Sequence, residues 1–191
     1  MKKFLKVVSF VLGITILGCG IGYCSSSVTV CEQYNFYGDA SRGELREEYF
    51  GIKLADLEKN SNGEYVMTDE QRKVFIDNIL GVHKCSLQWI SWERFGECKF
   101  FLAGNKLMCK GGQRIGNEYL IIDGQIEVIS PLHLRFVGTI RSRTNADDVK
   151  KETVRKGVYN FKVRGQRGYW RMQEIVNPLQ GHADYIDIYF F

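Results

Sequence analysis

Residues 118–129, Glu-Tyr-Leu-Ile-Ile-Asp-Gly-Gln-Ile-Glu-Val-Ile, decide the fold class of this chain. Two largely apolar segments, 118–122 and 125–129, flank the dipeptide Asp123-Gly124. Asp-Gly between two β-like segments is a strong hairpin signal, because both residues of the favoured two-residue turn need a positive φ. The stretch therefore predicts two antiparallel strands that share one apolar side.

A period-two pattern continues on both sides of this stretch. Upstream, residues 97–103 and 106–110 flank Gly104-Asn105, a second hairpin signal. Downstream, a bend is expected at Ser130-Pro131 and a polar connection at 144–156. Apolar residues alternate in four further segments, 132–140, 159–163, 169–175 and 185–191.

About eight sequential strands with short connections suit a closed barrel, because closure leaves no strand edge unpaired. We therefore expect a mainly β fold, an antiparallel meander that closes into a small barrel of about eight strands or a curled sheet. The C-terminal alternation that ends on Phe191 is also typical of outer-membrane barrels, but charged outward faces argue against that class.

One or two helices are expected before the strands. Thr68 and Gln71 have the spacing of a capping box, and apolar side chains follow at helical intervals, so a helix is predicted over 69–81. The mixed, charged segment 44–59 suggests a second helix interrupted at Gly51. Both are expected to lie on the sheet. This architecture is similar to that of small lipocalin- and avidin-like barrels, although no motif of either family is present; it implies an interior that holds side chains or one small ligand.

The first 23 residues have the composition of an export signal. Lys2, Lys3 and Lys6 precede an apolar run at 7–17, which is shorter than the roughly 20 residues of a bilayer span. We expect a signal at 1–23, a tether and first strand at 24–43, and one β-rich domain at 44–191. The formal net charge of +4 falls to about +1 without the three signal lysines, so no nucleic-acid partner is expected.

The run Ile16-Leu17-Gly18-Cys19 resembles the lipobox of bacterial lipoproteins. The resemblance implies that Cys19 is acylated, with palmitate-type chains, and becomes the mature N-terminus. The protein would then be anchored to a membrane of the cell envelope, facing the periplasm or the cell surface. Two alternatives stay open, namely cleavage after Gly22 or Cys24 to give a soluble secreted or periplasmic protein, and an uncleaved anchor.

Five further cysteines follow Cys19, and export favours disulfides. The candidates for disulfide bonds are Cys31, Cys85, Cys98 and Cys109. A Cys98–Cys109 bridge across a hairpin and a Cys31–Cys85 bridge are both compatible with the sequence. No metal or other cofactor is expected, because Cys-x-x-Cys pairs and histidines at ligand spacing are absent from the sequence.

Two aromatic groups are candidate ligand-binding residues. Trp89 and Trp92 either line a pocket or fill the core. Tyr169, Trp170 and Arg171 form the densest cationic and aromatic run, in which Arg171 binds an anion or pairs with Glu174 or Asp187 on another strand. His182 and Asp184 are expected to be a solvated loop pair.

No catalytic motif is present, so we predict no catalytic residue and a non-enzymatic protein. The first hypothesis is an envelope lipoprotein whose barrel binds a small apolar or aromatic ligand. The alternative is an interaction or structural protein with an envelope protein partner, in which the barrel is a scaffold. A secreted enzyme is the third hypothesis.

Overall fold

The computed structural model describes residues 47–145 and 151–190. The chain divides into two compact units, and all described residues belong to the second, Ala40–Phe191. The predicted signal, tether and first strand (1–43) lie outside the described residues, as do Cys19 and Cys31. In the described ranges, no helix is long and apolar enough to cross a bilayer.

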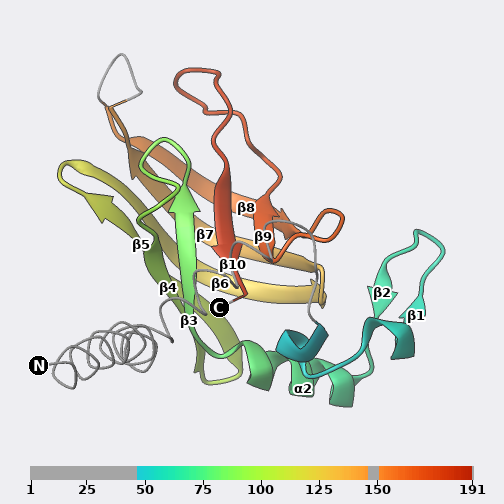
Figure 1. Cartoon of the computed structure of the whole chain (residues 1–191). Coiled ribbons are helices and arrows are strands. Elements are labelled where there is room, and N and C mark those ends of the chain that lie inside the picture. The colour runs from blue at the N-terminus through green and yellow to red at the C-terminus, as the bar shows by residue number, and fades with distance from the viewer. Residues whose placement is uncertain (1–46, 146–150, 191) are drawn as a thin grey trace, which may run out of the picture. The chain divides into compact units, whose positions relative to one another are not determined.

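Short elements precede the barrel (Figure 1). The expected helix at 44–59 is reduced to two 3-10 turns, η1 (Glu47–Phe50) and η2 (Leu54–Asp56), which Gly51 separates with a φ of 64°. A small ribbon of β1 (Glu58–Lys59) and β2 (Tyr65–Val66) follows.

The predicted helix is confirmed as α2 (Asp69–Ile79). The Thr68 hydroxyl accepts a hydrogen bond from the Gln71 amide (3.2 Å), and the Gln71 side chain accepts one from the Thr68 amide (2.9 Å). These two bonds satisfy amides that the first helical turn leaves unpaired. The helix ends at Ile79 rather than at 81, because Gly81 already begins the first barrel strand.

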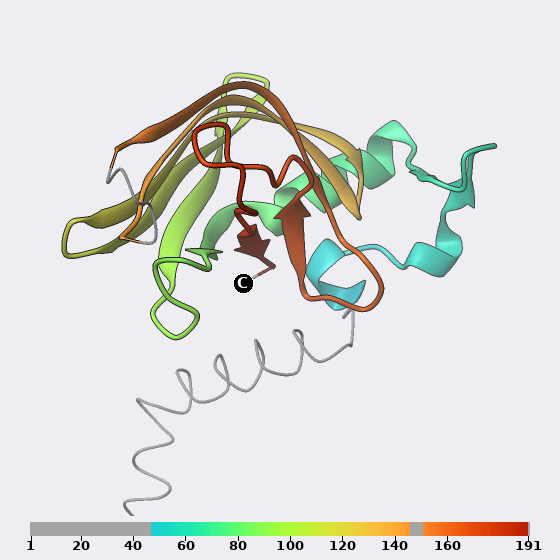
Figure 2. The same cartoon turned by 90° about the horizontal axis from the view of Figure 1, so that it is seen from above.

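Eight antiparallel strands form a closed barrel, which confirms the predicted fold class. They are β3 (Gly81–Leu87), β4 (Gly96–Ala103), β5 (Lys106–Ile115), β6 (Glu118–Ser130), β7 (His133–Arg143), β8 (Thr153–Lys162), β9 (Tyr169–Met172) and β10 (Ile186–Tyr189). Neighbours in sequence pair throughout, and β10 closes the barrel against β3. Figure 2 shows the long strands as an arch, with the short β9 and β10 on its open side.

The hairpin at Gly104-Asn105 is confirmed, because Ala103 pairs with Lys106. The hairpin at Asp123-Gly124 is wrong: β6 runs without a break through both residues, and the chain turns at Gly116-Asn117 instead. The predicted polar connection at 144–156 is also shorter than expected, since β8 begins at Thr153.

A close approach between strands explains the glycine at position 124. Gly124 pairs with Gly138 and faces the interior, where an added Cβ would lie 2.5 Å from the Val137 carbonyl oxygen and 2.6 Å from the Phe136 ring. Gly124, Gly138 and Gly157 are cross-strand neighbours on β6, β7 and β8. Glycines inside strands allow sharp local curvature. Gly124 therefore allows β6 and β7 to approach closely in the curved wall of the barrel, and it does not form a turn.

Aromatic side chains fill the barrel near α2. Phe50 of η1 lies 5.5 Å from the Phe75 ring of α2 and 5.1 Å from that of Phe190 (ring centroids). Trp170 lies 4.6 Å from Phe190 and donates its indole N–H to the Pro131 carbonyl oxygen (3.0 Å). The four aromatic side chains are at most 1 % exposed. The short N-terminal elements thus close one end of the barrel, where chain connections are tight.

Candidate functional site

Several connections lie at the opposite end of the barrel, which we call the loop end. Those described in full are 88–95, 116–117 and 173–185, and β7 ends and β8 begins at the same end. Figure 1 shows the β3–β4 and β9–β10 connections rising there. Barrels commonly carry their variable binding loops at one end of a rigid wall.

Two tryptophans of the β3–β4 connection are exposed at the loop end. Trp89 is 40 % exposed and Trp92 is 50 % exposed. The Trp89 indole N–H donates to the Ala183 carbonyl oxygen (3.1 Å), and its ring lies edge-on to His182 at 5.3 Å. Neither tryptophan fills the core, so that alternative is wrong, and both side chains lie at the surface.

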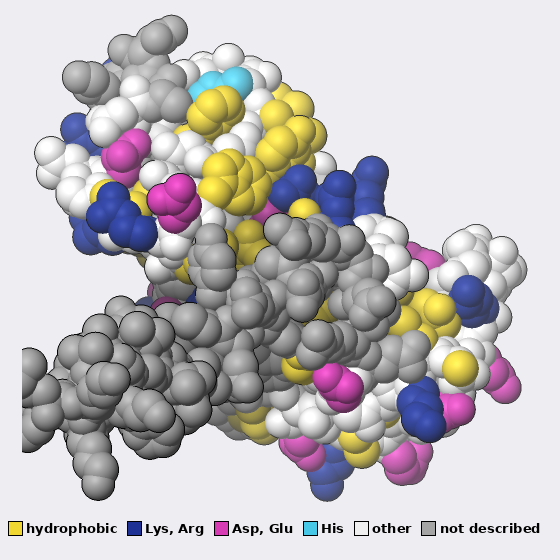
Figure 3. Space-filling model, viewed as in Figure 1, with side chains coloured by type: hydrophobic (Ala, Val, Ile, Leu, Met, Phe, Trp, Pro, Cys, Tyr) yellow, Lys and Arg dark blue, Asp and Glu magenta, His cyan; other side chains and the backbone are white. Residues whose placement is uncertain are grey.

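The β9–β10 connection carries further exposed apolar side chains. Val176 is 64 % exposed and Leu179 is 53 % exposed, and Val176 forms a bridge with Ala183, the residue that Trp89 contacts. We call Trp89, Trp92, Val176 and Leu179 the loop-end patch. Figure 3 shows hydrophobic side chains gathered at the end of the molecule where these two connections lie in Figure 1.

A buried polar network fixes the β9–β10 connection. Arg155 of β8 donates to the Asp184 carboxylate (2.7 Å) and to the Val176 carbonyl oxygen (3.2 Å). Asn177 donates to the same carboxylate oxygen (3.0 Å), and the other oxygen lies 3.1 Å from His182 Nε2. The prediction of a solvated His182–Asp184 pair is wrong for Asp184, which is 1 % exposed. With three partners, this carboxylate holds the loop in place.

Gln113 of β5 plays the same part for the β3–β4 connection. Its side-chain oxygen accepts the Leu87 amide (2.8 Å), while its amide donates to the carbonyl oxygens of Ser91 (3.2 Å) and Arg94 (2.7 Å). Gln113 is 2 % exposed. The backbone of both loops that carry the patch is therefore held from inside the barrel by buried polar side chains.

The other predicted ligand residues do not join this patch. Trp170 points into the core, whereas Tyr169 and Arg171 lie on the other face of β9. Arg171 forms two hydrogen bonds of 2.6 Å to Asp187, and its guanidinium lies 4.4 Å from the centre of the Tyr185 ring. Burial raises the pKa of Asp187, against the opposing effect of Arg171. Arg171 is thus the cross-strand ion-pair partner that the sequence offered as one alternative.

Cys85, Cys98 and Cys109 are buried free thiols. The Cys98–Cys109 bridge is therefore absent: the two residues lie on paired strands, but Cys98 stands opposite Gly111 and Cys109 opposite Phe100. Cys85 is also unbridged, while Cys31 lies outside the described residues. Within 47–145 and 151–190, no three His, Cys, Asp or Glu side chains are arranged to hold a metal ion.

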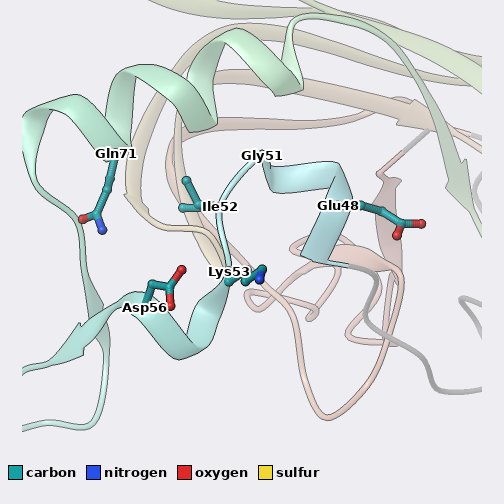
Figure 4. Close-up of a pocket in the computed structure, with 6 residues that line it drawn as sticks. All are labelled: Glu48, Gly51, Ile52, Lys53, Asp56 and Gln71. Carbon is teal, nitrogen blue, oxygen red and sulfur yellow. The ribbon is translucent and has the colours of Figure 1, made fainter.

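One hollow lies away from the loop end, between the 3-10 turns and the start of α2 (Figure 4). It measures about 680 Å³. Its lining residues are Glu48, Gly51, Ile52, Lys53, Asp56 and Gln71. Most of their side chains are polar and of mixed charge, and no sequence pattern pointed to this hollow.

Comparison with known proteins gives a family for this chain. The PM1083 family matches residues 63–190. The chain belongs to the PM1083 family. It is 34 % identical over 125 residues to "Uncharacterized protein PM1083" of Pasteurella multocida (strain Pm70), a match that covers 65 % of this chain and 82 % of that protein. No solved structure matches the chain.

The loop-end patch lies within the residues that match the PM1083 family, whereas most of the hollow lies outside them. Residues 63–190 include the whole barrel, all four residues of the loop-end patch, and Gln113, Arg155 and Asp184. Of the hollow's lining, only Gln71 lies within them. The loop end is therefore the stronger candidate for a site that belongs to the family domain.

Proposed function

We propose that this chain is an exported cell-envelope protein, held on a membrane by acylation of Cys19, whose barrel is a non-enzymatic module that binds a protein partner through the loop-end patch. The export and anchoring part rests on the sequence: a cationic start, a short apolar run, and the lipobox-like Ile16-Leu17-Gly18-Cys19. Acyl chains supply membrane affinity without a spanning helix.

The observation that carries the binding part is an exposed aromatic and aliphatic patch on immobilised loops. Exposed tryptophans beside apolar side chains are typical of residues that dominate protein interfaces. Side chains on fixed loops lose less conformational freedom on association, so more of the contact energy remains as affinity. Gln113 and the Arg155–Asp184 pair provide this immobilisation.

The filling of the barrel favours a surface partner over an internal ligand. Phe136 covers the inward face of Gly124 and Gly138, and Phe100 and Trp170 occupy the neighbouring interior. A small apolar or aromatic ligand remains the second candidate, because Trp89 and Trp92, three residues apart on one loop, offer two exposed rings for stacking.

The anchor is tested by the mass of the mature protein from native membranes. Acylation predicts a chain that begins at Cys19 and carries acyl groups, and Cys19→Ser should abolish the acyl mass and release the protein from membranes. A lipid-free mass that begins near Ser25 would contradict the anchor and support a soluble secreted protein.

The binding surface is tested by placing a photo-crosslinking amino acid at single positions in the full chain, in its native envelope. Trp92 and Leu179 (50 % and 53 % exposed) probe the patch, and Val154 and Val158 (51 % and 54 %) are matched controls on the barrel wall. We expect one discrete protein adduct from both patch positions, weakened by Trp89→Ala, and none from the wall. Equal adducts from wall and patch would refute the loop-end site, and an adduct of low mass would favour the small ligand.

A further inference from the structure

Three thiols form a row across adjacent strands inside the barrel. Cys85, Cys98 and Cys109 belong to β3, β4 and β5, and each is 0 % exposed. In the strand register each cysteine stands opposite a glycine. The pairs are Cys85 with Gly96, Cys98 with Gly111, and Cys109 with Gly124.

The glycines bring the thiols together. Because Cys85 and Cys98 each stand opposite a glycine on the next strand, their nearest inward neighbours there are the diagonal ones, and these include the next cysteine of the row. At Gly111, where φ is 154°, an added Cβ would lie 2.1 Å from the Glu97 carbonyl oxygen and 2.7 Å from the Cα of Cys98. This close approach of β4 and β5 places Cys109 diagonal to Cys98, while Cys85 lies diagonal to Cys98 on the other side, on β3.

Cys98 is the acceptor at the centre of the row. The thiols of Cys109 and Cys85 donate to it, and these bonds together with the nearby His83 lower the pKa of Cys98 well below its usual range. Donation to Cys98 and burial raise the pKa of Cys85 and of Cys109. The row therefore has one thiol of lowered pKa between two thiols of raised pKa.

His83 supports a negative charge at Cys98, its direct cross-strand partner. Its Nδ1 lies 2.9 Å from the Tyr189 carbonyl oxygen, and its Nε2 lies 2.8 Å from that of Ile79. Each ring nitrogen thus has a carbonyl oxygen within hydrogen-bonding distance, and these two contacts hold the imidazole ring beside the Cys98 side chain.

We propose that Cys98 is an oxidation site for a small hydroperoxide such as hydrogen peroxide, which closes a reversible disulfide between Cys98 and one of the two flanking thiols, Cys85 or Cys109. The Cys98 sulfur attacks one peroxide oxygen, the O–O bond breaks, and a sulfenic acid and hydroxide form. The flanking sulfur then attacks the sulfenic sulfur, loses its proton, and displaces the oxygen as water. Two thiols are oxidised to one disulfide, and one peroxide is reduced to two waters.

Access depends on local opening, because the row is buried. β10 is held to β3 by three residue pairs, Ile186–Leu87, Asp187–Ser86 and Ile188–Cys85, and Cys85 belongs to the last of them. Short pairings of this kind open more readily than a whole domain. Loss of the β10 pairing also releases the His83 contact to Tyr189. Oxidation is therefore expected to be slow in the native protein and faster in dilute urea.

The sequence allows each thiol to be followed separately. Cleavage after lysine and arginine places Cys85 in peptide 85–94, Cys98 in peptide 95–99 and Cys109 in peptide 107–110. Reduced full-length protein is treated with hydrogen peroxide, its remaining thiols are alkylated, and the digest is analysed by mass spectrometry. We expect peptide 95–99 linked to 85–94 or to 107–110, with the link lost on reduction.

Variants distinguish this assignment from general oxidation. Cys98→Ser should abolish every link, whereas Cys85→Ser should leave the link between 95–99 and 107–110. A sulfenic-acid reagent should label peptide 95–99 first in the wild-type chain, a readout that needs no folded variant. A link between 85–94 and 107–110 without 95–99, or peroxide labelling that leaves 95–99 unmodified in dilute urea, would overturn the proposal.

Discussion

Arg155 and Asp184 form an ion pair inside the barrel, with 2.7 Å between Nη2 and Oδ2 and side chains only 3 % and 2 % exposed. The two residues lie 29 positions apart, on β8 and at the end of the β9–β10 connection. β9 pairs with β8 only at Phe161 and Lys162, so this ion pair ties the loop to the strand where strand pairing is lacking.

Removing one member of this pair should destabilise the domain strongly. Asp184→Ala leaves the Arg155 charge buried without its carboxylate, and such a loss costs about 3–5 kcal/mol. Urea unfolding of the single variant and of the double variant Arg155→Met/Asp184→Leu measures the effect. We expect the double variant to be more stable than the single one, because it leaves no buried charge.

A surface pair is the control for this comparison. Arg135 and Glu127 form an ion pair with side chains 47 % and 36 % exposed. Arg135→Met should change the free energy of unfolding by less than about 1 kcal/mol. Equal losses from Asp184→Ala and Arg135→Met would show that the Arg155–Asp184 pair does not fix the loop.

The interior glycines give a second prediction. Gly138→Ala would place a Cβ 2.4 Å from the Asp123 carbonyl oxygen and 2.6 Å from the Cα of Gly124. Both atoms are backbone, so the strands must move apart, and overpacking of this kind costs about 1–3 kcal/mol. Gly104→Ala is the control: no atom lies within 4 Å of its added Cβ, and only the φ of 62° opposes it. Thermal melts should show a larger loss for Gly138→Ala.

The misplaced hairpin shows where prediction from sequence reached its limit. The alternation of apolar residues was sufficient for the fold class, the hairpin at Gly104-Asn105 and the inward side of β7. Asp123-Gly124 has the composition of a turn, but the glycine is required by a neighbouring strand that is distant in sequence. A local sequence pattern cannot distinguish a turn from a close approach between strands, because both favour glycine, which has no side chain.

The buried polar side chains of the loop end were missed for a related reason. Arg155 lies in the charged segment that was predicted to be a connection between strands. Its burial depends on Asp184, 29 residues later. A partial signal existed: counting back by twos from the inward Phe161 reaches Arg155 and Thr153, which share its side of β8. Trp89 and Trp92 remain candidate binding residues, and their position at the loop end needed the three-dimensional structure.

Acid titration of Glu152 gives a third prediction. The Tyr119 hydroxyl donates to its carboxylate (2.5 Å), and this bond is the main cause of a lowered pKa for Glu152. A lowered folded-state pKa stabilises the fold above the ordinary carboxyl range, and this contribution is lost as the pH falls through the folded-state value. Carbon NMR should find the pKa of Glu152 higher in Tyr119→Phe than in the wild type. An unchanged value would assign the shift to Arg141, the other group that lowers it.

Gln113 links the stability of the barrel to the proposed binding surface. Gln113→Leu keeps the size of the side chain but removes the partners of the Leu87 amide and of the Ser91 and Arg94 carbonyl oxygens. An unpaired buried polar group costs about 1–3 kcal/mol. Hydrogen exchange should accelerate across 88–95 and change less in β7. Crosslinking from Trp92 should fall, and crosslinking from Leu179 should fall less. Gln125→Leu on the adjacent strand is the matched substitution. If Gln113→Leu left both the exchange of 88–95 and the Trp92 adduct at wild-type levels, fixed loop geometry would not be what makes the patch competent to bind.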